Sequence, residues 1–101
     1  MLFMLRIDVS LPPEMPDAEK KLLRERENAY AAQLIEQDRL LHIWRIVGRV
    51  ANFSIWQAPD LEALHESIMS MPMFQYMKID VIPMISHPMT DMAETRRKIS
   101  R

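Results

Sequence analysis

A single glycine, Gly48, separates two short runs of β-forming residues in this chain of 101 residues. The first run spans 40–47 and the second spans 50–56, and both contain Ile, Val and Trp. Two such runs joined by so short a break predict a β-hairpin, because a turn that needs positive φ is where a lone glycine is most useful. A chain with one glycine also lacks the glycine-rich loops that bind nucleotide phosphates.

The first half of the chain predicts a strand followed by a long helix. In residues 2–10 the apolar side chains alternate with polar ones, and Arg6 and Asp8 fall on the opposite side from the apolar set. This period of two is typical of a half-buried strand. Residues 17–37 contain no Gly or Pro and are rich in Ala, Leu, Glu, Lys and Arg, which favours a helix.

The second half predicts another helix and a last strand. Pro59-Asp60 precedes an amphipathic helix over 61–71, Pro72 ends it, and residues 76–85 read as a strand. The order β-α-β-β-α-β predicts an α+β, ferredoxin-like fold with an antiparallel sheet and both helices on one face. Because the other face of the sheet would be bare, we expect a second copy of the chain to cover it.

Composition excludes several classes of protein. Lys and Arg number 13 against 14 Asp and Glu, so the basic excess of a nucleic-acid binder is missing. The chain has no cysteine, which removes disulfides and zinc-thiolate sites. No apolar run reaches the ~18 residues of a membrane span, and we expect a cytoplasmic protein. We expect one domain over 1–88 and a basic tail over 89–101, either disordered or packed on a neighbouring subunit.

Glu27 is the most informative polar residue. On an ideal helix Leu23, Tyr30 and Leu34 form one stripe, and Glu27 lies only about 40° from Leu23, within that stripe. A carboxylate that faces a core is usually paired or has a raised pKa. Because Arg24 lies one turn before Glu27, the alternative is a surface ion pair of little energetic value.

The hairpin carries further polar candidates. His42 and Trp44 share one face of the first hairpin strand, Arg45 takes the other face, and Asn52 and Ser54 share a face of the second strand. A His or Asn in a strand is more often a satisfied core residue than a ligand. The histidines also lack the spacing of metal ligands, so the available chemistry is that of carboxylate, imidazole and guanidinium groups.

Several long, ordered segments resemble one enzyme family. These are the opening Met1-Leu2-Phe3, the hairpin segments 42–48 (His-Ile-Trp-Arg-Ile-Val-Gly) and 51–54 (Ala-Asn-Phe-Ser), and the run 71–79. Together with Glu27 they resemble muconolactone delta-isomerase over about residues 1–88, whereas the tail from Met89 is not covered.

The resemblance implies an activity and a site. It implies a ring-shaped homo-oligomer, a decamer built from dimeric α+β barrels, that isomerises muconolactone to 3-oxoadipate enol-lactone in catechol degradation without a metal or organic cofactor. Glu27 is then the catalytic base, with Asn52 and His42 as donors to the developing oxyanion. The substrate is a small lactone carboxylate, and the expected substrate-binding residues are Arg24, Lys20, Lys21, Trp44 and Tyr30.

Three positions depart from the family pattern. Met4, Leu40 and Val50 stand where relatives often carry His, Trp and Tyr. If these positions line the pocket, the pocket is more apolar, which favours a methyl- or chloro-substituted lactone. Two alternatives therefore stay open: a chloromuconolactone dehalogenase of the same family, and a non-catalytic ligand-binding α+β barrel subunit.

Overall fold

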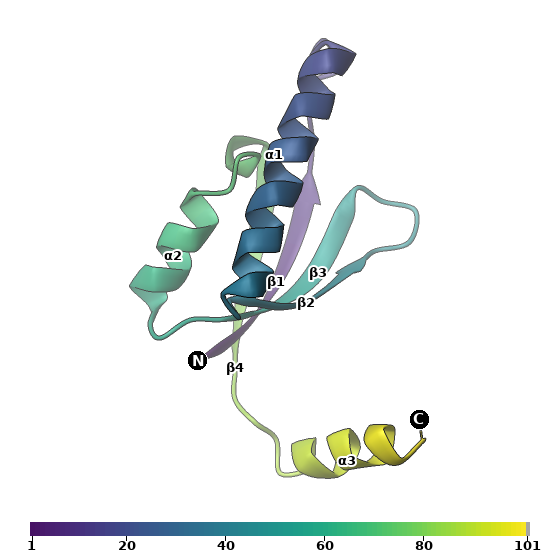
Figure 1. Ribbon diagram of the computed structural model, residues 1–101, viewed down its shortest axis with the longest axis vertical. Helices are drawn as coiled ribbons and strands as arrows, with labels where there is room; N and C mark the ends of the chain where they lie inside the picture. Colours follow the sequence, from purple (N-terminus) through teal and green to yellow (C-terminus); the bar gives the residue numbers. More distant parts are fainter. Residues whose placement is uncertain (101) are drawn as a thin grey trace.

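The structure is a computed structural model that describes the backbone of residues 1–100 and the side chains of residues 1–97. Its elements follow one another along the chain in an order that matches the sequence prediction, with one additional helix at the end (Figure 1). They are β1 (Leu2–Val9), α1 (Asp17–Glu36), β2 (Leu40–Arg45), β3 (Ala51–Gln57), α2 (Leu61–Met69), the 3-10 turn η1 (Phe74–Tyr76), β4 (Met77–Met84) and α3 (Thr90–Ser100).

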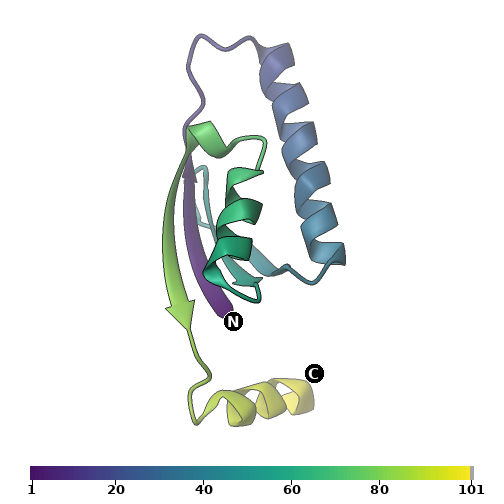
Figure 2. The same ribbon diagram turned by 90° about the vertical axis from the view of Figure 1, so that its left-hand side faces the viewer.

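The four strands form one antiparallel sheet in the order β2-β3-β1-β4. Helices α1 and α2 lie on the same face of this sheet (Figure 2). The predicted α+β class, the antiparallel sheet and the two helices on one face are confirmed. The association of such subunits into barrels concerns more than one chain and stays a prediction.

Alternation along β1 explains which face of the sheet is covered. Phe3 and Leu5 are fully buried and Ile7 nearly so, under the two helices. Arg6 and Asp8 point to the opposite face, where the Arg6 Nε donates to Asp8 Oδ2 at 3.1 Å. Burial of the apolar side chains of β1 against the helices provides the main driving force for this layer.

The β2–β3 hairpin has a wider loop than predicted. Gly48 adopts φ +78°, the left-handed conformation expected of the lone glycine. The strands, however, stop at Arg45 and resume at Ala51, and the Ile46 N–H closes the loop by donating to the Ala51 carbonyl at 3.0 Å. Val47 is 95% exposed in this loop, so its apolar character did not indicate a strand position.

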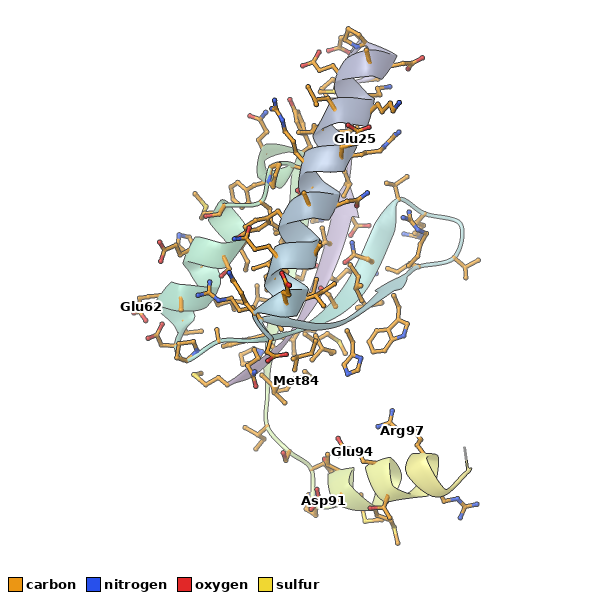
Figure 3. All side chains as sticks on the ribbon, viewed as in Figure 1. Glu25, Glu62, Met84, Asp91, Glu94 and Arg97 are labelled. Carbon is orange, nitrogen blue, oxygen red and sulfur yellow. The ribbon has the colours of Figure 1, made fainter. Side chains whose placement is uncertain are left out.

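The C-terminal tail, for which the sequence left disorder and packing on a neighbouring subunit open, contains helix α3 over Thr90–Ser100. His87 and Thr90 form a local turn at its start, in which the His87 N–H donates to Thr90 Oγ1 at 2.9 Å. Helix α3, which carries Asp91, Glu94 and Arg97, stands apart from the sheet and its two helices (Figure 3). Whether it packs on a neighbouring subunit stays a prediction.

Candidate active site

A cavity of about 500 Å³ lies between the sheet and helix α1 and extends to the segment that joins α2 to β4. Its polar lining includes Arg24, Glu27 and Asn28 from α1 and Arg45 and Asn52 from the hairpin. The rest of the wall is mostly apolar, and includes Ile7, Val9, Leu34, Leu40, Ile43, Val50, Met71, Met73 and Met77. An apolar cavity with a few polar groups is the usual form of a small-molecule site.

Glu27 is turned inward as predicted. It is half-buried in the cavity wall, and its Oε2 accepts a hydrogen bond from the Met73 N–H at 3.1 Å. That N–H is available because α2 has already ended and Pro72 prevents its continuation. Burial raises the pKa of Glu27, and the hydrogen bond from Met73 opposes part of this effect. A carboxylate of this kind can take up and release a proton.

Two other residues of α1 that were expected to bind substrate, Arg24 and Tyr30, also line the cavity. The Tyr30 hydroxyl donates to the Ser67 carbonyl at 2.9 Å. Tyr30 therefore lines the cavity while its hydroxyl is hydrogen-bonded to α2. Arg24, one turn before Glu27, is exposed and makes no ion pair within the described part of the chain. The structure thus places Arg24 and Tyr30 in the wall of the cavity that Glu27 also lines, and their binding of substrate stays a prediction.

The sheet contributes Arg45 and Asn52, which are directly opposite each other in the β2–β3 pairing. The Asn52 Oδ1 is buried and has no hydrogen-bond partner among the described residues. A buried acceptor without a donor costs free energy, so this atom marks a place where a ligand or a moving side chain would be stabilised.

The structure does not bring His42 and Trp44 to this cavity. Both side chains lie on the outer face of the sheet, where their rings stack at 5.3 Å with an interplanar angle of 8°. Because side chains alternate along a strand, the face shared by Arg45 and Asn52 is the one that His42 and Trp44 cannot share. His42 and Asn52 of one chain therefore cannot reach the same oxyanion, and a shared role between two chains stays a prediction.

Lys20 and Lys21 also lie outside the cavity wall, although both were expected to bind substrate. Lys20 is two turns before Glu27, roughly 10 Å along the helix axis at 1.5 Å per residue. Lys21 is exposed. Helix α1 begins at Asp17, whereas its cavity-lining residues begin at Arg24. A lysine on the same side of the helix as Glu27 can therefore still lie too far along the helix axis to reach the cavity.

Sequence reasoning missed Arg45, Asn28 and the three cavity methionines. For Arg45 the sequence did carry a signal, because the predicted hairpin pairs the strand of Arg45 with that of Asn52, and the two residues lie opposite each other. Met71, Met73 and Met77 carried no such signal, because their position depends on how the segment after α2 folds back toward α1.

The three departures from the family pattern are not equivalent in the structure. Leu40 and Val50 line the cavity, Leu40 as a buried residue and Val50 as an exposed one. Met4 lies on the outer face of β1 instead, because it alternates with Phe3 and Leu5. The prediction of a more apolar pocket therefore rests on Leu40 and Val50 only.

Two other structural properties bear on the kind of protein this is. Across residues 1–97, no group of three or more His, Cys, Asp or Glu side chains is arranged to hold a metal ion. None of the helices in the described part of the chain combines the length and the apolar character that crossing a bilayer requires.

Comparison with known proteins gives consistent results. A family profile for muconolactone delta-isomerase matches residues 1–90. The muconolactone delta-isomerase of Cupriavidus pinatubonensis is 41% identical over 88 residues, which are 87% of this chain and 96% of that protein. Muconolactone delta-isomerase 1 of Acinetobacter lwoffii is also 41% identical, over 87% of this chain and 92% of its own length.

A solved structure is similar as well. The crystal structure of muconolactone isomerase at 3.3 Å resolution matches with a TM-score of 0.83 and 39% sequence identity, over 87% of this chain and 92% of that one. The family match spans the sheet, α1, α2 and every residue that lines the cavity.

Proposed function

We propose, from the premise that this chain belongs to the muconolactone delta-isomerase family, that it isomerises muconolactone or a substituted muconolactone to the corresponding enol-lactone, with Glu27 as the base. The observation that carries this proposal is the half-buried Glu27 carboxylate in the wall of an otherwise largely apolar cavity. The reaction would serve the breakdown of catechol-type aromatic compounds.

The chemistry requires one base and no redox step. The ring carbon that bears the carboxymethyl arm loses its proton to Glu27, and the electron pair spreads through the conjugated C=C and C=O into a dienolate. The same carboxylic acid then returns the proton to the ring carbon next to the carbonyl, so one C–H bond breaks, another forms and the double bond moves by one position. A carboxyl group whose pKa is raised toward neutrality suits both halves of this transfer.

Stabilisation of the dienolate falls to the sheet side of the cavity. Asn52 lies in that wall, and its side-chain amide can donate to the lactone carbonyl oxygen as negative charge develops there. His42 cannot fill this role in the same chain because it lies on the outer face. The apolar remainder of the wall excludes water and strengthens these interactions.

Substitution of the base is the direct test of the proposal. Glu27→Gln should lower kcat on muconolactone by about 10²–10⁴-fold, the usual contribution of a positioned general base. Ultraviolet absorbance follows the reaction because the conjugation of the lactone changes. Glu25→Gln is the matched control, since Glu25 is exposed on the same helix and lies outside the cavity wall (Figure 3). Unchanged turnover by Glu27→Gln would remove Glu27 as the base.

One observation favours a substituted substrate. Leu40 and Val50 give the cavity apolar side chains where a methyl group or a chlorine could be buried. If the substituent is a chlorine on the arm carbon next to the reacting ring carbon, removal of the ring proton can be followed by loss of chloride with formation of a C=C between these two carbons, which is the dehalogenase alternative. Turnover of muconolactone and of its methyl and chloro analogues, with chloride release measured in parallel, distinguishes these substrates.

The non-catalytic alternative loses its main argument. A binding or scaffolding subunit would be favoured by a solvent-exposed Glu27 with no pocket beside it, whereas this Glu27 is half-buried and lines a cavity. We further propose that the protein works in the cytoplasm as a homo-oligomer, a decamer built from dimers. The bare outer face of the sheet supports such an assembly, because it exposes Trp44 and Ile82.

A further inference from the structure

Arg45 is a cation at the cavity wall that has no partner among the described residues. Its side chain is exposed at the cavity wall and forms neither an ion pair nor a hydrogen bond within the described part of the chain. Arg6 illustrates the alternative, because its guanidinium is occupied by Asp8 and lies over the Phe53 ring on the outer face. A free guanidinium at an apolar cavity is suited to bind a carboxylate with two parallel hydrogen bonds.

The register of the sheet places Arg45 across the cavity from the base. Arg45 is opposite Asn52, Asn52 is opposite Ile7, and Ile7 is opposite Ile79, so these four residues form one row across the helix-covered face. Arg45 lies in the edge strand β2, whereas Glu27 is bonded to Met73, just before the other edge strand β4. Since neighbouring strands are about 4.8 Å apart, the two edge strands β2 and β4 are separated by three spacings, roughly 14 Å.

This separation fits the chemistry of the substrate. A productive complex needs the ring C–H within about 3.5 Å of the Glu27 carboxylate, while the carboxymethyl arm carries a second negative charge. Two carboxylates close together repel each other, so the arm is better placed on the far side of the ring from Glu27. In strand order Arg45 belongs to one edge of the sheet, whereas Met73, which binds Glu27, precedes the strand at the other edge.

We propose that Arg45 binds the free carboxylate of the lactone substrate and thereby orients the acidic ring C–H toward Glu27, an inference that rests on the proposed function. A guanidinium has five N–H donors, so an arginine that binds a carboxylate through two of them retains others. One of these can donate to the unpaired Asn52 Oδ1 on the neighbouring strand. Carboxylate binding by Arg45 would thus also give the buried Asn52 Oδ1 a donor.

Arg24 is the competing candidate. It also lines the cavity and was expected from the sequence to bind the carboxylate. It precedes Glu27 by one helical turn, however, so a carboxylate held by Arg24 would lie on the same side of the cavity as the base. The position of Arg45 avoids this crowding of two negative charges.

The test compares the charged substrate with a neutral analogue. Muconolactone and its methyl ester present the same ring C–H, but only the acid has a carboxylate for Arg45. Arg45→Met should lower kcat/KM for the acid by on the order of 10- to 100-fold, the loss expected for hydrogen bonds to a charged group, and mainly through KM. The kcat/KM of Arg45→Met for the ester should stay close to the wild-type value. For the acid, the kcat/KM of Arg45→Lys should lie between those of the wild type and Arg45→Met.

Controls separate this role from a structural one. Arg49→Met removes the same charge from the hairpin loop outside the cavity wall and should leave both substrates unaffected. Arg24→Met should affect the acid less than Arg45→Met does. The inference is overturned if Arg45→Met keeps wild-type kcat/KM on the acid, if it lowers acid and ester equally, or if only Arg24→Met shows the acid-selective loss.

Failure of the proposed function gives a different result. A wild-type protein that turns over neither lactone contradicts the isomerase proposal, whatever Arg45 does. Calorimetric titration of the wild type and Arg45→Met with the acid and the ester then decides the role of Arg45. Tighter binding of the acid that depends on Arg45 supports the inference, and equal binding of acid and ester by the wild type overturns it.

Discussion

At the residue scale, the inward position of Glu27 could be predicted from the sequence, but its hydrogen bond could not. Helical periodicity alone places Glu27 beside Leu23 and Tyr30. The donor on Met73 is 46 positions away in the chain, and it reaches Glu27 only because α2 and η1 fold back against α1. Local patterns fix the direction of a side chain, whereas its partner depends on tertiary packing.

The raised pKa of Glu27 predicts the pH dependence of catalysis. The base must be ionised in the free enzyme, so kcat/KM should rise with pH along a limb controlled by Glu27. Because burial raises this pKa from its ordinary value of 4.5, the limb should be centred above pH 4.5. A pH–rate profile of the wild type measures it. A limb centred at or below 4.5 contradicts the proposed desolvation of Glu27.

The same desolvation predicts that Glu27→Gln stabilises the fold at neutral pH. A carboxyl group with a raised folded-state pKa binds its proton more tightly in the folded chain, so its ionisation destabilises the fold as pH rises above 4.5. Glutamine carries no charge, and its Oε1 can still accept from the Met73 N–H. The gain at pH 7 should be no more than about 1 kcal/mol, because solvent screens a half-exposed group.

Urea unfolding at pH 7 and at pH 4 measures this gain. The advantage of Glu27→Gln over the wild type should shrink at pH 4, where most of the wild-type carboxyl groups are protonated in both states. Glu25→Gln, at an exposed position, should show neither the gain nor its pH dependence. A variant less stable than the wild type at pH 7 would show that the ionised carboxylate gains more from the Met73 N–H than its desolvation costs, relative to a neutral glutamine.

At the element scale, the strands and the two faces of each strand could be predicted from the sequence. Which residues of neighbouring strands share a face was predicted only in part. The alternation in β1 and in the hairpin assigned Arg45 and His42 to opposite faces correctly. The expectation of a shared role for His42 and Asn52 does not fit that assignment within one chain. The pairing of β2 with β3 puts Arg45, not His42, opposite Asn52. The helix that covers the sheet then decides which face becomes the site (Figure 2).

The contact between α1 and α2 predicts the effect of Tyr30→Phe. The Ser67 carbonyl lies in the last turn of α2, where carbonyl groups lack intrahelical donors, and the Tyr30 hydroxyl supplies one at 2.9 Å. Its removal should lower the free energy of unfolding by about 1 kcal/mol. Because this hydroxyl is engaged with α2, kcat/KM should change little. Denaturant unfolding and the lactone assay measure the two effects.

Tyr76→Phe is the matched control for this substitution. The Tyr76 hydroxyl forms no hydrogen bond within the described part of the chain, so its removal should leave the stability nearly unchanged. A large loss of turnover in Tyr30→Phe with unchanged stability would instead assign the Tyr30 hydroxyl to the substrate.

At the scale of the whole molecule, the chain is more extended than a self-contained domain of its length. Its radius of gyration is 15.6 Å, whereas about 13 Å is typical of a compact domain of ~100 residues. Helix α3 contributes to this difference, because it stands apart from the sheet (Figure 1). The basic composition of the tail gave no signal of this helix, and sequence patterns do not report where a terminal helix lies.

The outer face of the sheet predicts how the chain assembles. Trp44 is 56% exposed and Ile82 is 49% exposed on a sheet face that none of the described elements covers. Burial of such side chains against a second copy would gain hydrophobic free energy at no cost to the Glu27 cavity, which lies on the opposite face. Light scattering should therefore give a mass that is a multiple of 12.0 kDa, and Trp44→Glu should lower it.

Val47→Glu is the matched control. It adds the same charge at a residue 95% exposed in the hairpin loop and should leave the mass unchanged. A wild-type mass of 12.0 kDa contradicts the assembly, and an unchanged mass in Trp44→Glu places the contact elsewhere on the molecule.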